Sequence, residues 1–222
     1  MIRFARPFTV FLFSWLLACP ALADQKTGIY ASLSPAITSP AAEPTTLDEV
    51  EIDSTNILDP IIMGQDAKFK MKFGLGINGE VGYKWRTSIR TGLEVGYRAS
   101  DIDQVKSTAG SGLVDGQLET STVFLNIAYD FDNEEGPAPY IFGGMGAAYN
   151  ELDLRSVNSR SVGQVADDLT FAFQVGAGFY KPINEFIDAG LGYRYVFVND
   201  TNFGNISTEF GVHHIELTFR LF

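Results

Sequence analysis

The chain has 222 residues and a formal net charge of -11, from 27 Asp and Glu against 16 Lys and Arg. This charge excludes a nucleic-acid binder, because neutralising phosphates requires a basic face and none accumulates along the chain. The single Cys excludes a disulfide scaffold. With 45% hydrophobic residues, 22 Gly, 18 Phe and 9 Tyr, the composition favours many β-strands over a disordered chain.

Residues 1–23 have the three parts of a bacterial signal peptide. Arg3 and Arg6 form a positive n-region, residues 8–18 are an apolar h-region, and Ala21-Leu22-Ala23 is a small-residue cleavage site. The alternative is a lipoprotein signal, in which Cys19 would carry the lipid. Residues 24–222 are the predicted mature chain, which is more acidic than its precursor because two arginines are removed.

The mature sequence predicts β-strands. No apolar run in it approaches the roughly 20 residues of a transmembrane helix. Apolar residues instead alternate with polar or small ones at a period of two, as in 170–182, where Phe171, Phe173 and Val175 share one face. The segments of this kind are eight: 28–37, 73–85, 89–98, 122–131, 139–149, 170–182, 186–197 and 213–221.

The connections between these segments alternate in length. Short turns are expected at 86–88, 132–138 and 184–185, and longer loops at about 39–66, 100–116, 154–169 and 199–211. An antiparallel up-and-down sheet has this pattern, and eight strands can close into a barrel without an exposed edge. The first long loop, about 39–66, is acidic and contains no Lys or Arg, so we expect it to be solvated.

The charges on the polar face decide which side of the barrel meets water. Five acids and five bases lie there: Glu80, Lys84, Arg90, Glu94, Arg98, Asp130, Asp188, Arg194, Glu216 and Arg220. A water-exposed face of so acidic a chain has no reason to be balanced, whereas inside a narrow barrel each charge needs a partner. We therefore predict a lumen filled by ion pairs, such as Glu94 or Glu216 with Arg194. Arg220 is the alternative partner for these two carboxylates.

Aromatic residues on the apolar face gather in two bands. Near the short-turn end lie Tyr83, Trp85, Tyr129, Phe131, Phe179 and Phe219, and near the long-loop end lie Tyr97, Tyr149, Phe171, Tyr195 and Phe197. Leu93, Leu125, Val175, Leu191 and Leu217 lie between the bands. Two aromatic girdles around an aliphatic band are typical of a transmembrane barrel. The sequence thus predicts an all-β, eight-stranded, antiparallel, up-and-down transmembrane β-barrel.

Three runs resemble those of the small eight-stranded outer-membrane proteins: PYIFGGMG at 139–146, FQVGAG at 173–178 and LGYRY at 191–195, together with the aromatic terminal strand. That family includes the opacity-type proteins, α-proteobacterial surface antigens and the transmembrane part of outer-membrane protein A. The resemblance implies the bacterial outer membrane, with long loops extracellular and short turns periplasmic. The implied partners are outer-membrane lipid, lipopolysaccharide and the barrel assembly machinery. One departure is that Glu216, Thr218 and Arg220 share the phase of the terminal Phe222, where apolar residues are usual.

The function expected from these features is a non-enzymatic surface or envelope role carried by the long loops, which could contact a host or matrix ligand. We predict no catalytic residue, cofactor or metal site. Residues 74–79 match the dinucleotide string G-x-G-x-x-G, but strand alternation continues through them.

Two other functions stay open. His213 and His214, with Ser207 and Glu209 nearby in the chain, leave open a lipid A deacylase or acyltransferase. The charged lumen leaves open a small-solute channel, although side chains just fill an eight-stranded barrel.

Overall fold

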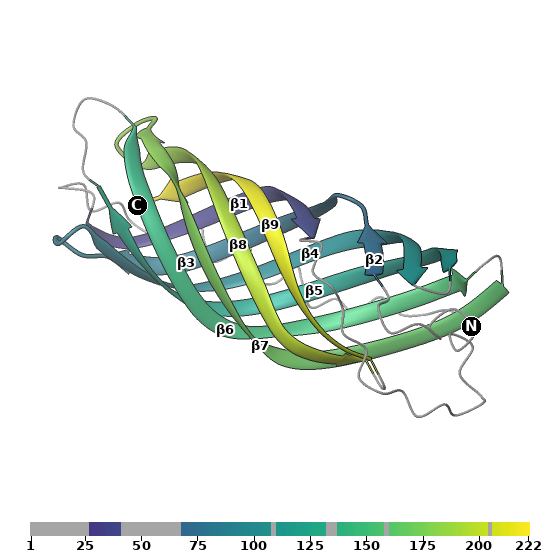
Figure 1. Ribbon diagram of the computed structural model, residues 1–222. Coiled ribbons are helices and arrows are strands. Elements are labelled where there is room, and N and C mark those ends of the chain that lie inside the picture. The colour runs from purple at the N-terminus through teal and green to yellow at the C-terminus, as the bar shows by residue number, and fades with distance from the viewer. Residues whose placement is uncertain (1–26, 41–67, 108–109, 132–136, 158–159, 204–205) are drawn as a thin grey trace, which may run out of the picture.

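The computed structural model describes residues 27–40, 68–107, 110–131, 137–157, 160–203 and 206–222 (Figure 1). Its strands are β1 (Gly28–Pro40), β2 (Lys68–Met71), β3 (Gly74–Lys84), β4 (Ile89–Ser107), β5 (Gly110–Asp130), β6 (Ala138–Val157), β7 (Arg160–Pro182), β8 (Ile187–Phe203) and β9 (Ile206–Leu221). This part of the chain contains no helix that is long and apolar enough to cross a membrane. The predicted signal peptide and Cys19 lie outside the described residues, as does the first loop from residue 41 to 67.

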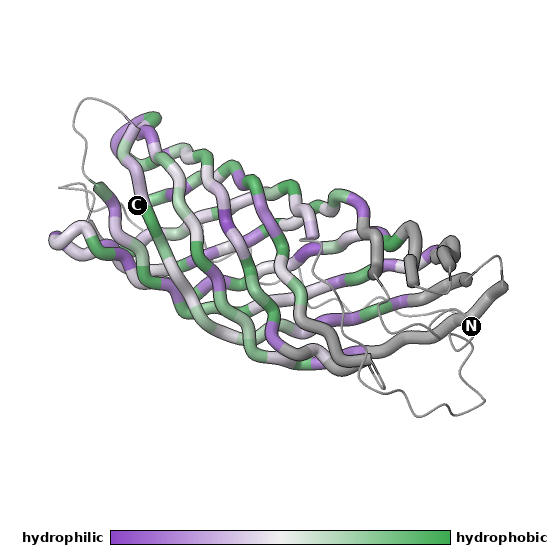
Figure 2. The backbone as a smooth tube through the Cα atoms, viewed as in Figure 1, coloured by the Kyte–Doolittle hydropathy of each residue, from purple (hydrophilic) through white to green (hydrophobic). Residues whose placement is uncertain are grey.

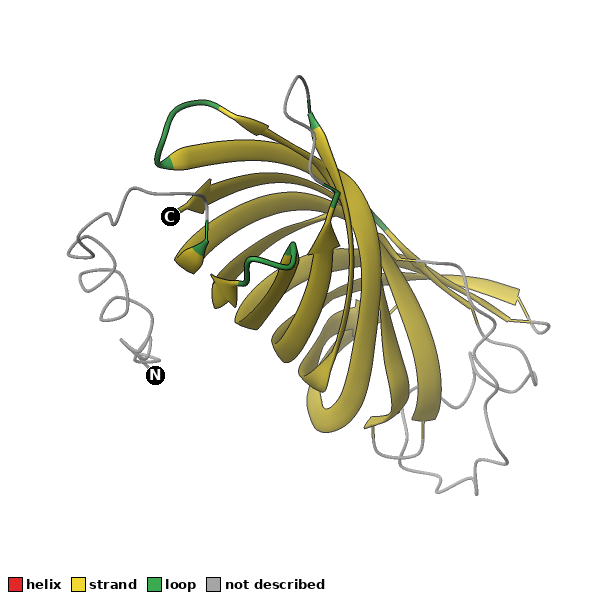
Figure 3. Cartoon of the chain, turned by 90° about the vertical axis from the view of Figure 1, so that its left-hand side faces the viewer, coloured by secondary structure: helices red, strands yellow, loops and turns green. Residues whose placement is uncertain are grey.

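The strands form one closed antiparallel barrel. β1 pairs with β3 on one side and with β9 on the other, and the pairing of β4 with β5 joins the remaining edges. β2 and β3 both pair with β4 and are separated only by Lys72 and Phe73, so they make one interrupted barrel strand. The barrel thus has eight strands, which confirms the predicted fold class. Figure 3 shows these strands curving around the lumen.

The two ends of the barrel differ in their connections. At one end, the short-turn rim, the connections are 85–88, 131–137 and 183–186, and β1 begins and β9 ends there. At the other end, the hairpin rim, β4 joins β5, β6 joins β7 and β8 joins β9. Strand polarity alternates along most of the barrel, visible as alternating purple and green in Figure 2. Even-numbered positions face the lumen there and odd-numbered positions face outward.

The long loops expected at 100–116, 154–169 and 199–211 are wrong, because these residues continue the strands. β4 pairs with β5 as far as Ser107 and Gly110, and β6 with β7 as far as Val157 and Arg160. Each of the three hairpins contains a register shift, for example between Ile102 and Gln104. A bulge adds one residue on one strand and so changes the phase of the alternation. This change of phase hides the strands from a period-two pattern.

The three hairpins continue beyond the outward-facing girdle residues of their own strands. β4 runs on from Tyr97 to Ser107. At about 3.3 Å per residue and a strand tilt of about 40°, this lifts the end of the hairpin about 25 Å above Tyr97. We call these paired ends the hairpin extension: residues 98–107 and 110–120 of β4 and β5, 150–157 and 160–170 of β6 and β7, and 198–203 and 206–212 of β8 and β9.

Where its side chains are described, the hairpin extension buries both apolar and polar residues and carries many carboxylates on its outside. Its buried apolar side chains include Ile102, Leu118, Leu152, Val198, Phe210 and Val212, and its buried polar side chains include Arg98, Ser100, Thr120, Asn150 and Thr201. Its outward side chains include Asp101, Asp115, Glu119, Glu151, Asp153 and Asp167. Nearer the short-turn rim the interior contains most of the buried charges, and the exterior carries exposed aliphatic side chains such as Leu93 and Leu125 instead of carboxylates.

Candidate functional site

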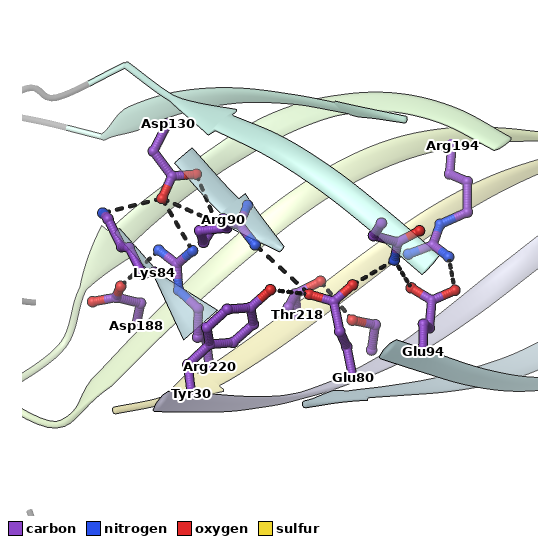
Figure 4. Close-up of polar contacts among 12 residues, drawn as sticks. Tyr30, Glu80, Lys84, Arg90, Glu94, Asp130, Asp188, Arg194, Thr218 and Arg220 are labelled. Carbon is purple, nitrogen blue, oxygen red and sulfur yellow. Dashed lines mark hydrogen bonds and ion pairs between the residues drawn. The ribbon is translucent and has the colours of Figure 1, made fainter. Parts of the chain in front are cut away.

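All ten charged residues assigned to the lumen from the sequence lie on the inner face of the barrel. Eight are buried, and Glu80 and Lys84 are partly buried. Nine of the ten take part in ion pairs within 4.0 Å, drawn in part in Figure 4. Arg98 is the exception among the described residues. The charges group into two clusters, one near the short-turn rim and one at the middle of the lumen.

The first cluster is centred on Asp130 at the end of β5. Its carboxylate lies 3.0 Å from Lys84 Nζ, 2.9 Å from Arg90 Nε and 3.4 Å from Arg220 Nη1. Arg220 also contacts Asp188 at 2.9 Å. Three cations from β3, β4 and β9 thus converge on one carboxylate, which ties five strands together near the short-turn rim (Figure 4).

The second cluster is centred on Arg194 of β8. Its Nη1 lies 2.5 Å from Glu94 Oε1, and its Nη2 lies 3.0 Å from Glu216 Oε2. The amides of Gln174 and Asn126 each donate a hydrogen bond of 3.2 Å to Glu94. The expected pairing of Arg194 with these two acids is therefore present.

The alternative pairing of Arg220 with Glu94 or Glu216 is wrong. Arg220 lies near the end of β9, at the same height in the barrel as Asp130 and Asp188. It therefore belongs to the cluster near the short-turn rim, whereas Glu216 belongs to the cluster at the middle of the lumen. The stagger of neighbouring strands decides which residues share a level, and parity alone does not reveal that stagger.

Aromatic rings close the lumen around the first cluster. The Arg90 guanidinium lies 5.5 Å from the ring centroid of Tyr30, 5.6 Å from that of Tyr140 and 5.4 Å from that of Tyr180. Tyr140 and Tyr180 stack at 4.4 Å. A Cβ on Gly178 would lie 2.6 Å from the Tyr140 hydroxyl, so the ring needs glycine beside it.

None of these three tyrosines was assigned a role in the lumen from the sequence. All three occupy even-numbered positions of predicted strands, so the parity that located the charges was also the signal for them. The Tyr30 hydroxyl donates to the carboxylate of Glu80, which links the ring to the charge network.

The two histidines lie on opposite faces of β9. His213 faces outward, and its Nδ1 lies 2.6 Å from the Tyr193 hydroxyl. His214 is buried in the lumen, where its Nε2 lies 3.1 Å from Arg98 Nη1. The side chains of Ser207 and Glu209 lie outside the described residues, so the hydrolase hypothesis stays a prediction.

Nine of the eleven predicted girdle residues are exposed on the outer face: Tyr83, Trp85, Tyr97, Tyr129, Phe131, Tyr149, Phe171, Phe179 and Phe219. Tyr195 and Phe197 are half-buried, because Tyr195 lies against His213 at 5.0 Å and Phe197 stacks on Phe173 at 4.7 Å. In the register, Tyr149 lies opposite Ser121, eight residues along β5 from Tyr129. At about 3.3 Å per residue and a tilt of about 40°, the two girdles are about 20 Å apart, near the height of a membrane barrel's apolar band.

A closed barrel with a charged, filled lumen and a lipid-facing aliphatic band between aromatic girdles is an outer-membrane β-barrel. Residues 9–213 match the family model described as the outer membrane protein beta-barrel domain, and the chain belongs to this family. The protein is therefore a transmembrane protein of the bacterial outer membrane.

Similar proteins agree with this assignment. Neisserial surface protein A is similar with a TM-score of 0.53 and 16% identity, over 87% of this chain and 96% of that one. OprG of Pseudomonas aeruginosa has a TM-score of 0.51 and 16% identity, over 87% and 95% of the two chains. These likenesses show the fold and confirm the predicted resemblance. An uncharacterised protein of Brucella abortus strain 2308 is 26% identical over 156 residues, which cover 60% of this chain and 55% of that relative's length.

Proposed function

We propose that the protein acts at the cell surface through its hairpin extension, as a surface or envelope protein that neither catalyses a reaction nor conducts solutes. The observation that carries this proposal is the change on the outer face beyond the outer aromatic girdle, where exposed aliphatic side chains give way to carboxylates such as Asp101, Asp115 and Asp167. A charged exterior is what a strand assembly needs in order to stand in water. The extension is therefore built as a folded platform above the membrane.

The orientation follows from the same feature. The hairpin rim is extracellular in this proposal, and the short-turn rim is periplasmic. Outer-membrane barrels characteristically carry short periplasmic turns and longer extracellular connections. The outward carboxylates of the extension make its sides strongly acidic, so a host or matrix partner would meet them with basic groups.

The two ion-pair clusters in the lumen make an open channel unfavourable. The carboxylates of Asp130, Glu94 and Glu216 are each held by at least one buried cation. Tyrosine rings cover Arg90 from several strands. Opening an aqueous path would require breaking ion pairs in a low-dielectric interior, which is costly. A planar-bilayer recording of the purified protein should show no stable conductance, and a steady open channel would replace this proposal.

The histidines give a hydrolase little support. His213 hydrogen-bonds a tyrosine, and His214 is buried against a guanidinium. Lipid A from a strain that overexpresses the protein should match that of the parent strain. Altered acylation that disappears with His213→Ala or His214→Ala would instead establish the enzyme.

Shortening the hairpins tests the surface role directly. Asp101 lies opposite Gln117 in the register, so an Asn-Gly turn can replace 102–116 and keep the barrel closed. Asp153 lies opposite Val165, so 154–164 can be replaced in the same way. The doubly shortened protein should still fold, as shown by a mobility difference between unboiled and boiled membrane samples. Its strain should lose adhesion to immobilised matrix or gain detergent sensitivity, and an unchanged phenotype in both assays would contradict the proposal.

A further inference from the structure

The outer part of β7 has a strand partner on only one of its edges. It pairs with β6 as far as Arg160, which lies opposite Val157. On the other edge, within the part of the chain that the structure describes, its pairing with β8 ends at Ala172, opposite Val198. Figure 1 shows β6 and β7 running on together past the β8–β9 hairpin. We call the unpaired side of residues 160–169 the β7 edge.

β8 leaves the wall of the barrel where the β7 edge begins. Thr170 Oγ1 still donates to the carbonyl oxygen of Asn199 at 3.2 Å. Two residues further, Thr201 is fully buried, and its Oγ1 accepts from Asn150 Nδ2 at 3.4 Å. Asn150 is a fully buried residue of β6. β8 therefore turns inward over the lumen at this point, away from the β7 edge.

The backbone of the β7 edge directs hydrogen-bonding groups to its unpaired side. In an antiparallel ladder, successive residues direct their N–H and C=O groups alternately to the two neighbouring strands. Just beyond β7, the backbone N–H of Ile183 donates to a carbonyl oxygen of β8 at 2.9 Å. The register of β7 is regular over residues 164–182, so its odd-numbered residues keep this direction. Val165, Asp167 and Leu169 thus direct N–H and C=O groups to the side that β8 has left.

The charge around the β7 edge indicates which kind of strand can pair with it. Asp167 and Asp168 are consecutive, so each face of β7 carries one acid. On β6, Glu151 lies directly opposite Asp167. The sequence contains no Lys or Arg over residues 161–170. A second copy of the chain would bring the same acids to the edge, whereas a basic strand would form opposite-charge pairs with them.

We propose that the β7 edge binds an extended, basic segment of a partner protein by adding it to the sheet as a strand. The N–H and C=O groups of Val165, Asp167 and Leu169 pair with the backbone of the added strand. Asp167 and Asp168 meet its lysine or arginine side chains, which selects the partner by charge. The inference rests on the proposed surface role only for the place where such a partner is met, the extracellular side of the membrane.

The test is a calorimetric titration of the full chain, folded in detergent, with three blocked peptides. TVTKKVTVT has the charge and the strand propensity of the proposed partner, and TVTEEVTVT reverses the charge. TVPKKPTVT keeps the charge but cannot complete a ladder, because proline has no N–H. The first peptide should bind, and the other two should not bind measurably. Binding should weaken as the salt concentration rises, because salt screens the exposed charges.

Variants of the edge separate the backbone from the charge. Leu169→Pro removes an N–H on the unpaired side and keeps the ladder with β6, so the barrel should fold and bind TVTKKVTVT about tenfold more weakly. Leu169→Ala keeps that N–H and should bind like the unmodified protein. Asp167→Asn combined with Asp168→Asn should weaken binding about threefold to tenfold. Heat-modifiable mobility shows that each variant is folded, and the proline peptide keeps the test decisive if Leu169→Pro does not fold.

Three results would overturn the inference. Equal binding of TVTKKVTVT and TVPKKPTVT would exclude strand addition, and no binding of TVTKKVTVT would exclude the site. A dimer of the unmodified protein that Leu169→Pro dissociates would assign the edge to a second copy instead. A failed titration beside hairpin-dependent adhesion would overturn this inference alone. Peptide binding beside an unchanged phenotype of the doubly shortened protein would overturn the surface role alone.

Discussion

The same strands of this barrel run through two different surroundings, lipid between the girdles and water in the hairpin extension. Between the girdles, β5 presents Leu125 and Val123 to lipid and Asn126 and Thr122 to the lumen. A few residues further, in the hairpin extension, it buries Leu118 and turns Asp115 outward. The change takes place near Arg98, at the level of the outer girdle. The surroundings of each segment, lipid or water, therefore determine which face of the strand carries the apolar side chains.

The two ends also differ in what stabilises them. Between the girdles the interior is held by ion pairs and amide hydrogen bonds, which must be matched because the charges are buried. In the extension, where side chains are described, aliphatic and aromatic packing is combined with hydrogen bonds between neutral groups, from Thr120 to Asn150 and from Asn150 to Thr201. Substitutions of equal size should therefore have different effects in the two regions.

The largest effect is expected for Arg194→Gln. It leaves Glu94 and Glu216 buried without their shared cation, and breaking a buried pair in this way costs about 3–5 kcal/mol. Urea unfolding of the barrel in lipid vesicles should show this loss. Adding Glu94→Gln and Glu216→Gln to the variant should restore most of the stability. If neither Arg194→Gln nor Glu216→Gln changed the free energy of unfolding, the lumen network would not stabilise the barrel.

A lipid-facing charge should have the next largest effect. Leu125→Lys places an ammonium group in the middle of the apolar band, and should cost about 2–4 kcal/mol in vesicles. Asp115→Lys changes the same outer face of β5 in the extension and should stay within about 0.5 kcal/mol. Equal losses for the two variants would show that the outer face of the extension also contacts lipid.

A smaller effect is expected from the interior of the extension. Val198 is fully buried there, so Val198→Ala should cost about 2 kcal/mol from lost burial and the cavity it leaves. Val123→Ala is the matched change on the lipid-facing side, where Val123 is 49% exposed, and should cost less. Hydrogen exchange of the hairpin amides would report the difference locally. Indistinguishable exchange in the two variants would argue that the extension has no core of its own.

Much of the fold could be predicted from the sequence because strand parity is a strong signal in a lipid-facing barrel. Parity placed residues as far apart in the chain as Glu80 and Arg220 on one inner face. It could not predict their partners, because the stagger between strands brings Arg220 to Asp130 and Asp188. Contacts depend on level as well as on face.

The strands of the hairpin extension were predicted as loops for a physical reason. The apolar residues Ile102 and Val198 occupy positions that face inward, the side on which β4 otherwise carries charged or small residues and β8 carries Asp188 and Arg194. The bulges that follow them, before Gln104 and Thr201, then shift the phase. Two changes in the polar and apolar alternation within a few residues make the segment look like an irregular loop. For the same reason, nothing in the sequence set Arg98 apart from the nine paired charges.

The smallest predicted effect concerns a row of carboxylates just beyond the outer girdle. Glu151 lies directly opposite Glu119 on β5 and Asp167 on β7. Like charges in directly opposed positions repel, so Glu151→Gln should raise the unfolding free energy by about 0.2–1 kcal/mol at low salt. The gain should shrink at 1 M salt, where the Debye length falls to about 3 Å. A loss of stability at low salt would mean that the row is held by compensating contacts. The row would then resemble the lumen, where a buried carboxylate must have a partner, more than the water-exposed surface on which unpartnered acids are tolerated.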